Sequence, residues 1–136
     1  MSKDLIIHGA RKDLGGFSVY RSLPTVHKRS IGPFVFLDHM GPMVIDENHM
    51  LDVRPHPHIG LATVTFLYEG RGYHRDSLGS AQIISPGAVN LMVAGRGIVH
   101  SDRTPEEEKK FFGEKSIHGL QIWIGLPLSA EDCAPE

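Results

Sequence analysis

Short apolar runs separated by glycine and proline constrain the fold of this chain more than any other feature of its sequence. The runs are rich in β-branched and aromatic residues, which favour strands, and 15 glycines and 9 prolines fall largely between them. Turns at this spacing predict an all-β fold, an antiparallel β-sandwich or small barrel. The strands are expected at residues 17–22, 33–38, 61–68, 81–85, 89–94 and 120–126.

The size of the chain predicts one domain. A chain of 136 residues can bury enough apolar surface to fold without disulfides, and we expect residues 1–128 to form this domain. One segment, TPEEEKKFF (104–112), resembles a short helical turn, with Pro105 at a plausible first helical position and acidic residues before lysines. The polar tail 129–136 is expected to be loose.

The composition argues against several classes of protein. Lys and Arg total 14 against 16 for Asp and Glu, so no basic stripe is available for direct binding of nucleic acid. The single cysteine, Cys133, permits neither a disulfide framework nor a cysteine-based zinc site, and it fits a reducing cytoplasm. No stretch approaches the roughly 18 apolar residues that a membrane span requires, and the N-terminus has no apolar export signal.

Two pairs of candidate metal ligands share the same spacing. In RPHPHIG, His56 and His58 are two residues apart, so on an extended backbone both imidazoles project from one face. One such pair alone is more typical of exposed histidines at the rim of a barrel. A second pair, His100 and Asp102 in GRGIVHSDRTP, favours a metal site. On neighbouring strands the two pairs would supply three nitrogens and one carboxylate oxygen, leaving coordination positions open.

The other histidines are predicted to have surface or structural roles. His118 begins an apolar strand and is expected to be a buried histidine with satisfied hydrogen bonds; orientation of a metal ligand is the alternative. His39 follows a strand end and is expected to bond to a turn. The rest lie beside charged or turn residues and are expected to be solvated: His8, His27, His49 and His74.

Five segments of the chain, in their order and spacing, resemble the N-terminal half of the pirins. They are IGPFVFLDHMGP (31–42), RPHPHIGLATVTFLYEG (54–70), HRDSLGS (74–80), SPGAVNLMVAGRGIVHSDRTP (85–105) and HGLQIWIGLP (118–127). The match extends over nearly the whole chain. The resemblance implies a cupin fold, in which two antiparallel sheets curl into a small barrel with a metal inside one mouth.

The resemblance also implies a ligand set. Pirins bind their metal through a His-x-His and a later His-x-Glu, which map onto His56, His58, His100 and Asp102. Because aspartate is one methylene shorter than glutamate, Asp102 reaches the ion directly only if its strand lies closer, and otherwise acts through a water. Fe(II) is the expected ion, and Mn, Ni, Cu and Zn are alternatives because the same donors accept them.

A second cupin domain without a metal site normally follows in pirins, and residues 1–128 correspond to the first domain. We interpret the chain either as a fragment or as a natural single-domain form. The face that a second domain would cover should be apolar, and a symmetric homodimer is the simplest way to bury it.

Two functions of different classes follow from the resemblance. The first is a quercetin 2,3-dioxygenase-like cleavage of flavonols, in which Asp102 acts as the catalytic base and alternates between this role and metal binding. The second is an iron-dependent, redox-sensing regulator that binds a protein partner without catalysis. Fold alone does not separate them, because cupins host many unrelated activities.

Overall fold

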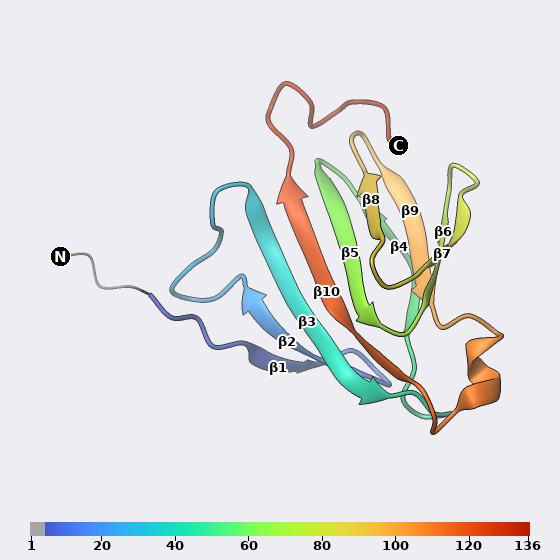
Figure 1. Ribbon diagram of the computed structural model, residues 1–136. Helices are drawn as coiled ribbons and strands as arrows, with labels where there is room; N and C mark the ends of the chain where they lie inside the picture. The colour runs from blue at the N-terminus through green and yellow to red at the C-terminus, as the bar shows by residue number, and fades with distance from the viewer. Residues whose placement is uncertain (1–4) are drawn as a thin grey trace.

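The computed structural model describes residues 5–136, and nearly all of its regular structure is antiparallel β-sheet (Figure 1). This confirms the predicted fold class. One sheet has six strands in the order β1 (Ala10–Asp13), β2 (Ser18–Leu23), β3 (Phe34–Val44), β10 (Ser116–Gly125), β5 (Leu61–Glu69) and β8 (Val89–Val93). The other has four strands in the order β4 (Asp52–His58), β9 (Ile98–Arg103), β6 (Gly72–Asp76) and β7 (Ala81–Ile84).

All six apolar runs lie on strands, with bounds that shift by a few residues. The sequence did not predict β1 or β6, because their segments ARKD and GYHRD lack an apolar run. These segments become strands by pairing with β2 and β9, respectively. The predicted helical segment contains one short 3-10 helix, η1 (Glu108–Phe111). No helix within residues 5–136 is long and apolar enough to cross a membrane.

The main hydrophobic core lies between the two sheets. Val19, Met40 and Leu67 project from the six-stranded sheet and pack in one cluster with Ile84 of the four-stranded sheet. Leu67 is only 1% exposed. Because both sheets bury their inner faces in this cluster, they form one packed unit that holds the strands of the site in a fixed relation.

The outer face of the six-stranded sheet carries exposed apolar side chains. Residues alternate along each strand, so Tyr68 points away from the buried Leu67, and Val89 and Leu91 point away from the buried Asn90. Tyr20 of β2 is also exposed. The apolar face expected where a second domain would lie, and the homodimer that would bury it, both stay predictions.

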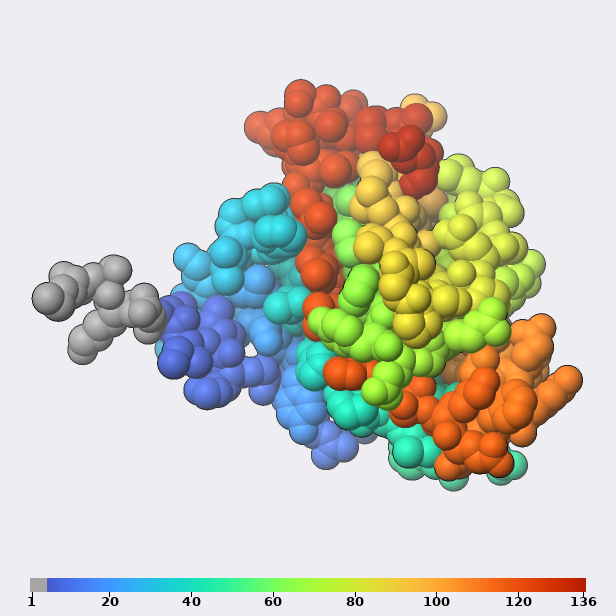
Figure 2. All heavy atoms as spheres, in the orientation of Figure 1, coloured from blue at the N-terminus to red at the C-terminus, as the bar shows by residue number. Residues whose placement is uncertain are grey.

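The C-terminal tail is tied to the domain, so the prediction of a loose tail was wrong. Val93 and Glu136 exchange two backbone hydrogen bonds of 2.7 and 3.0 Å, and the Arg96 N–H donates to the Cys133 carbonyl over 2.9 Å. Figure 2 shows this segment, in red, lying across the top of the molecule. Backbone pairing is independent of side-chain polarity, which explains why the polar composition of the tail gave no signal.

Replacement of Gly70 by alanine should destabilise the fold more than the same change at Gly79. Both glycines have positive φ, +78° and +96°, so each alanine carries a strain of about 1–2 kcal/mol. A Cβ on Gly70 would also lie 2.5 Å from the Ser116 carbonyl oxygen, whereas nothing lies within 4 Å at Gly79. Chemical denaturation should show a loss at least about 1 kcal/mol larger for Gly70→Ala. Equal losses would contradict the close approach.

Candidate metal centre

The register of three strands brings the predicted ligands together. Strand β9 pairs with β4 on one side and with β6 on the other, and all pairings are antiparallel. His100 on β9 lies directly opposite His56 on β4. Because side chains two apart on a strand share a face, His58 projects into the same space as His56. The side chains of all three histidines line one cavity between the sheets.

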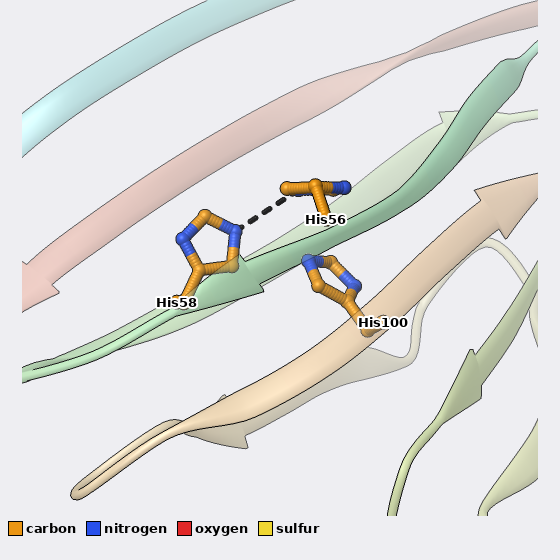
Figure 3. Close-up of side chains that lie close together, drawn as sticks. All are labelled: His56, His58 and His100. Carbon is orange, nitrogen blue, oxygen red and sulfur yellow. Dashed lines mark hydrogen bonds between the residues drawn. The ribbon is translucent and has the colours of Figure 1, made fainter.

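The three imidazoles converge (Figure 3). His56, His58 and His100 each offer one ring nitrogen, and these nitrogens all lie within 4.8 Å of one another. Nε2 of His56 is 3.1 Å from Nε2 of His58. His58 and His100 are 7% and 5% exposed, and His56 is half-buried. The site is therefore a nearly enclosed cluster of imidazoles, in contrast to exposed histidines at a rim.

The nitrogen atoms of this cluster fit a metal ion. The imidazole of His56 donates from Nδ1 to the Arg54 carbonyl over 2.8 Å, which leaves a lone pair on Nε2 facing the cluster. Two nitrogens at about 2.1 Å from one ion lie about 3 Å apart when their bonds meet near a right angle. Neither ring nitrogen of His100 makes a hydrogen bond in the described chain, although Nδ1 lies 3.1 Å from the Asp102 carboxylate. The buried Nε2 has no polar partner at all, and such an atom requires an explanation. A shared cation supplies one.

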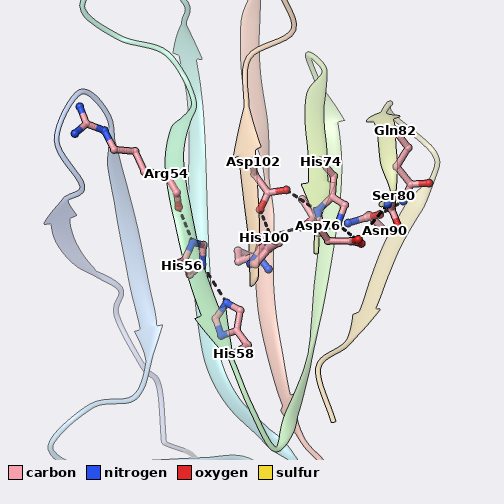
Figure 4. Close-up of polar contacts among 12 residues, drawn as sticks. Arg54, His56, His58, His74, Asp76, Ser80, Gln82, Asn90, His100 and Asp102 are labelled. Carbon is pink, nitrogen blue, oxygen red and sulfur yellow. Dashed lines mark hydrogen bonds and ion pairs between the residues drawn. The ribbon is translucent and has the colours of Figure 1, made fainter. Parts of the chain in front are cut away.

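Asp102 lies beside this cluster and belongs to a second group, with His74 and His100 (Figure 4). The reason is the register: Asp102 is opposite Val53 on β4 and opposite His74 on β6. One carboxylate oxygen accepts from His74 Nδ1 at 2.9 Å, and the other is 3.1 Å from His100 Nδ1. Direct binding of a metal by Asp102 stays a prediction.

His74 is a buried residue, so the prediction that it is solvated was wrong. It is 2% exposed and lies between two carboxylates, with Nδ1 2.9 Å from Asp102 and Nε2 3.2 Å from Asp76. Carboxylates only accept, so both ring nitrogens must carry a proton for both bonds to form. The sequence held a signal for this role, because His74 and Asp76 repeat the two-residue spacing of the other pairs.

The protonation states in the site follow from these contacts. The hydrogen bond to Asp102 raises the pKa of His74, which favours the imidazolium form. Burial would raise the pKa of Asp102, but its contacts with the imidazoles of His100 and His74 outweigh this and lower the pKa to about 2. Burial, reinforced by the neighbouring His100 and His56, lowers the pKa of His58 to about 4. At neutral pH, Asp102 is an anion and His58 a neutral imidazole that can bind a metal.

A cavity of about 230 Å³ adjoins the histidines. One wall carries the three imidazoles and Asp102, and the facing wall belongs to the six-stranded sheet. There Phe36 and Trp123 stack with ring centroids 4.0 Å apart and an interplanar angle of 12°. Trp123 also makes an edge contact with His58, with the ring centroids 4.8 Å apart. The site can therefore hold a planar ligand against an aromatic wall beside the imidazoles.

The remaining histidines lie outside this cavity. His39 was predicted to bond to a turn, but its Nε2 lies 2.8 Å from Nε2 of His118 on the neighbouring strand. His118 has this satisfied contact, but it is half-buried and does not orient a ligand of the cluster. The prediction of solvated side chains is confirmed for His8, His27 and His49.

Two antiparallel sheets around a buried histidine cluster define the class of this protein as a cupin. A family model named Pirin matches residues 16–124. The chain therefore belongs to the pirin family.

Relatives and solved structures agree with this assignment. A pirin-like protein from Caulobacter vibrioides is 48% identical over 134 residues, which cover 97% of this chain and 46% of the relative. The crystal structure of quercetin 2,3-dioxygenase from Acinetobacter baumannii aligns with a TM-score of 0.86 at 43% identity, covering 95% of this chain and 42% of that one. The chain thus spans about half the length of these relatives.

A third comparison concerns a metal complex. The crystal structure of a bacterial pirin from Escherichia coli in complex with nickel(II) aligns with a TM-score of 0.75 at 22% identity. The alignment covers 94% of this chain and 52% of that one. At this identity the likeness shows a shared fold.

The depressed pKa of His58 predicts that the metal-free protein loses stability as the pH falls from about 6.5 to about 4. Over this range His58 binds a proton in the unfolded chain and stays neutral in the fold. The free energy of unfolding should therefore fall by at most about 1.4 kcal/mol per pH unit from this group. Denaturant titrations at pH 7 to 4 give the free energy of unfolding of wild type and of His58→Ala. The variant should lack the part of the pH-dependent loss that comes from His58. Parallel pH profiles for the two proteins would contradict the prediction.

Proposed function

We propose that this chain forms the metal-binding part of a dioxygenase that cleaves flavonol-like aromatic hydroxy-ketones. The observation that carries the proposal is the convergence of three imidazoles, one with a buried Nε2 that has no partner in the described chain, on a cavity with an aromatic wall. The 43% identity to quercetin 2,3-dioxygenase from Acinetobacter baumannii supports the same reaction class.

The proposed ligands are His56, His58 and His100, with Asp102 as the fourth group, bound directly or through a water. Fe(II) is the proposed ion, and Mn, Ni, Cu and Zn are compatible with the same donors. When bound, such an ion offers open coordination positions and lowers the pKa of a coordinated hydroxyl group.

The cavity supplies binding and orientation in this proposal. A planar aromatic ligand that stacks against Trp123 lies next to His58, because the two rings are in edge contact at 4.8 Å. The stack of Phe36 on Trp123 fixes the position of this wall. Apolar side chains such as Leu67 and Ile84 line the same cavity, and they exclude water from the space around the imidazoles.

Asp102 is the proposed catalytic base, and its surroundings restrict this role. A carboxylate with a pKa of about 2 is a weak proton acceptor near neutral pH. In the proposal, Asp102 accepts the hydroxyl proton of the substrate after it loses one of its contacts with His100 and His74. His74 acts as a positioning residue, because its bond to Asp102 sets where the carboxylate points.

The remaining proposals rest on less specific observations. We propose a cytoplasmic location because the chain has a single cysteine, which suits a reducing compartment. A redox-sensing regulator would use the same metal ligands as the dioxygenase, so the two functions are separated by assay. We also propose a homodimer through the outer face of the six-stranded sheet, because this face carries exposed apolar side chains.

A metal titration tests the ligand set. Trp123 is the only tryptophan and touches His58, so nickel(II) should quench its fluorescence with a stoichiometry near one. His58→Ala and His100→Ala should weaken nickel binding by at least about 100-fold, because each removes a direct ligand. His49→Ala is the matched control, since His49 is exposed and outside the cavity. Equal affinities for wild type and His58→Ala would exclude the site.

Oxygen uptake tests the reaction. Iron-loaded protein mixed with quercetin under air should consume oxygen, and His56→Ala and His100→Ala should reduce the rate by at least about 100-fold because both remove ligands. His27→Ala, on the exposed surface, should keep the wild-type rate. Uptake by no flavonol or catechol in a well-loaded protein would contradict the dioxygenase and favour the regulator.

A further inference from the structure

A row of polar side chains crosses the inner face of the six-stranded sheet, on the wall of the cavity that faces the histidines. Arg21 on β2 is opposite Asp38 on β3, which is opposite Gln121 on β10, which is opposite Thr65 on β5. All four residues line the cavity. Asp38 and Thr65 are 3% and 6% exposed. Polar groups at such depth are costly unless they bind one another or a ligand.

The hydrogen bonds of this row leave specific groups free. Arg21 donates from Nε and Nη2 to the two oxygens of Asp38, both over 2.8 Å. The Thr65 hydroxyl donates to Oε1 of Gln121 over 2.8 Å. Within residues 5–136, Nε2 of Gln121 donates to no other side chain. Each Asp38 oxygen keeps a further lone pair, because a carboxylate accepts about four bonds.

The free groups are suited to a hydroxyl. Gln121 and Asp38 are register partners on neighbouring strands, so a free amide donor and a free carboxylate acceptor lie side by side. A hydroxyl group both donates and accepts, and it satisfies both at once. A carboxylate ligand would face the charge of Asp38, and Arg21 already directs two of its five N–H donors to that carboxylate. The row therefore favours a neutral hydroxyl over an anion.

We propose that Gln121 and Asp38 form a hydroxyl-binding subsite that selects aromatic substrates carrying a second hydroxyl group away from the reacting centre. Gln121 and Trp123 project from the same face of β10, and two residues on a strand span about 7 Å. A ring that stacks on Trp123 beside His58 thus reaches Gln121 about one ring length away. This inference rests on the proposed function, and it names the polyhydroxylated members of that substrate class.

A ligand comparison tests the subsite. Quercetin and 3-hydroxyflavone share the hydroxy-ketone, but only quercetin carries further ring hydroxyls. Calorimetric titration of zinc-loaded protein, which cannot turn over, measures both affinities, and metal-free protein is titrated in parallel. Gln121→Leu should weaken the affinity for quercetin about 3- to 10-fold, which corresponds to the loss of one net hydrogen bond. It should change the affinity for 3-hydroxyflavone less than twofold. Gln82→Leu is the matched control, because Gln82 lies outside the cavity.

A second variant keeps the test decisive if Gln121→Leu fails to fold. Thr65→Val has nearly the same shape and removes the hydroxyl that holds Oε1 of Gln121, so it should also weaken quercetin selectively, by about 2- to 5-fold. Equal losses for both flavonols, no loss for either, or no binding of quercetin by wild type would overturn the subsite. Selective loss without oxygen uptake by wild type would overturn the dioxygenase and leave the subsite standing.

Discussion

The antiparallel register of β9 is the constraint on which the site depends. This strand is hydrogen-bonded on both sides, with His56 of β4 and Asp76 of β6 both opposite His100. A shift by one residue would turn His100 and Asp102 out of the cavity, because alternate side chains point to opposite faces. The two sheets bury a shared core, and this packing resists such a shift. The position of the imidazoles is thus a consequence of strand pairing.

Charge balance is the second requirement of the arrangement. Asp102 is 7% exposed and His74 is 2% exposed, and a buried carboxylate without a partner would be strongly destabilising. The imidazolium of His74 bridges Asp102 and Asp76, so the anion persists next to the imidazole cluster. It also lies where it could offset the charge of a cation held by those imidazoles, which links the stability of the fold to the proposed chemistry.

The six-stranded sheet has a different part in this site. Its inner face carries the stacked Phe36 and Trp123 together with the polar row through Gln121. The four-stranded sheet thus supplies the candidate metal ligands, and the larger sheet supplies the groups proposed to contact a substrate. A cavity between two sheets allows these two sets of residues to change independently, which fits the variety of activities found on this fold.

The sequence by itself determined the all-β class and predicted His56, His58 and His100 as metal ligands. Both are local properties, because strand periodicity places residues two apart on one face. The pirin resemblance rested on motifs in the sequence as well. Only the tertiary structure decided that Asp102 faces His74, that the tail pairs with β8, and that Gln121 belongs to a polar row. These depend on which strands become neighbours and in which register, and such long-range pairing leaves no periodic signal in any one segment.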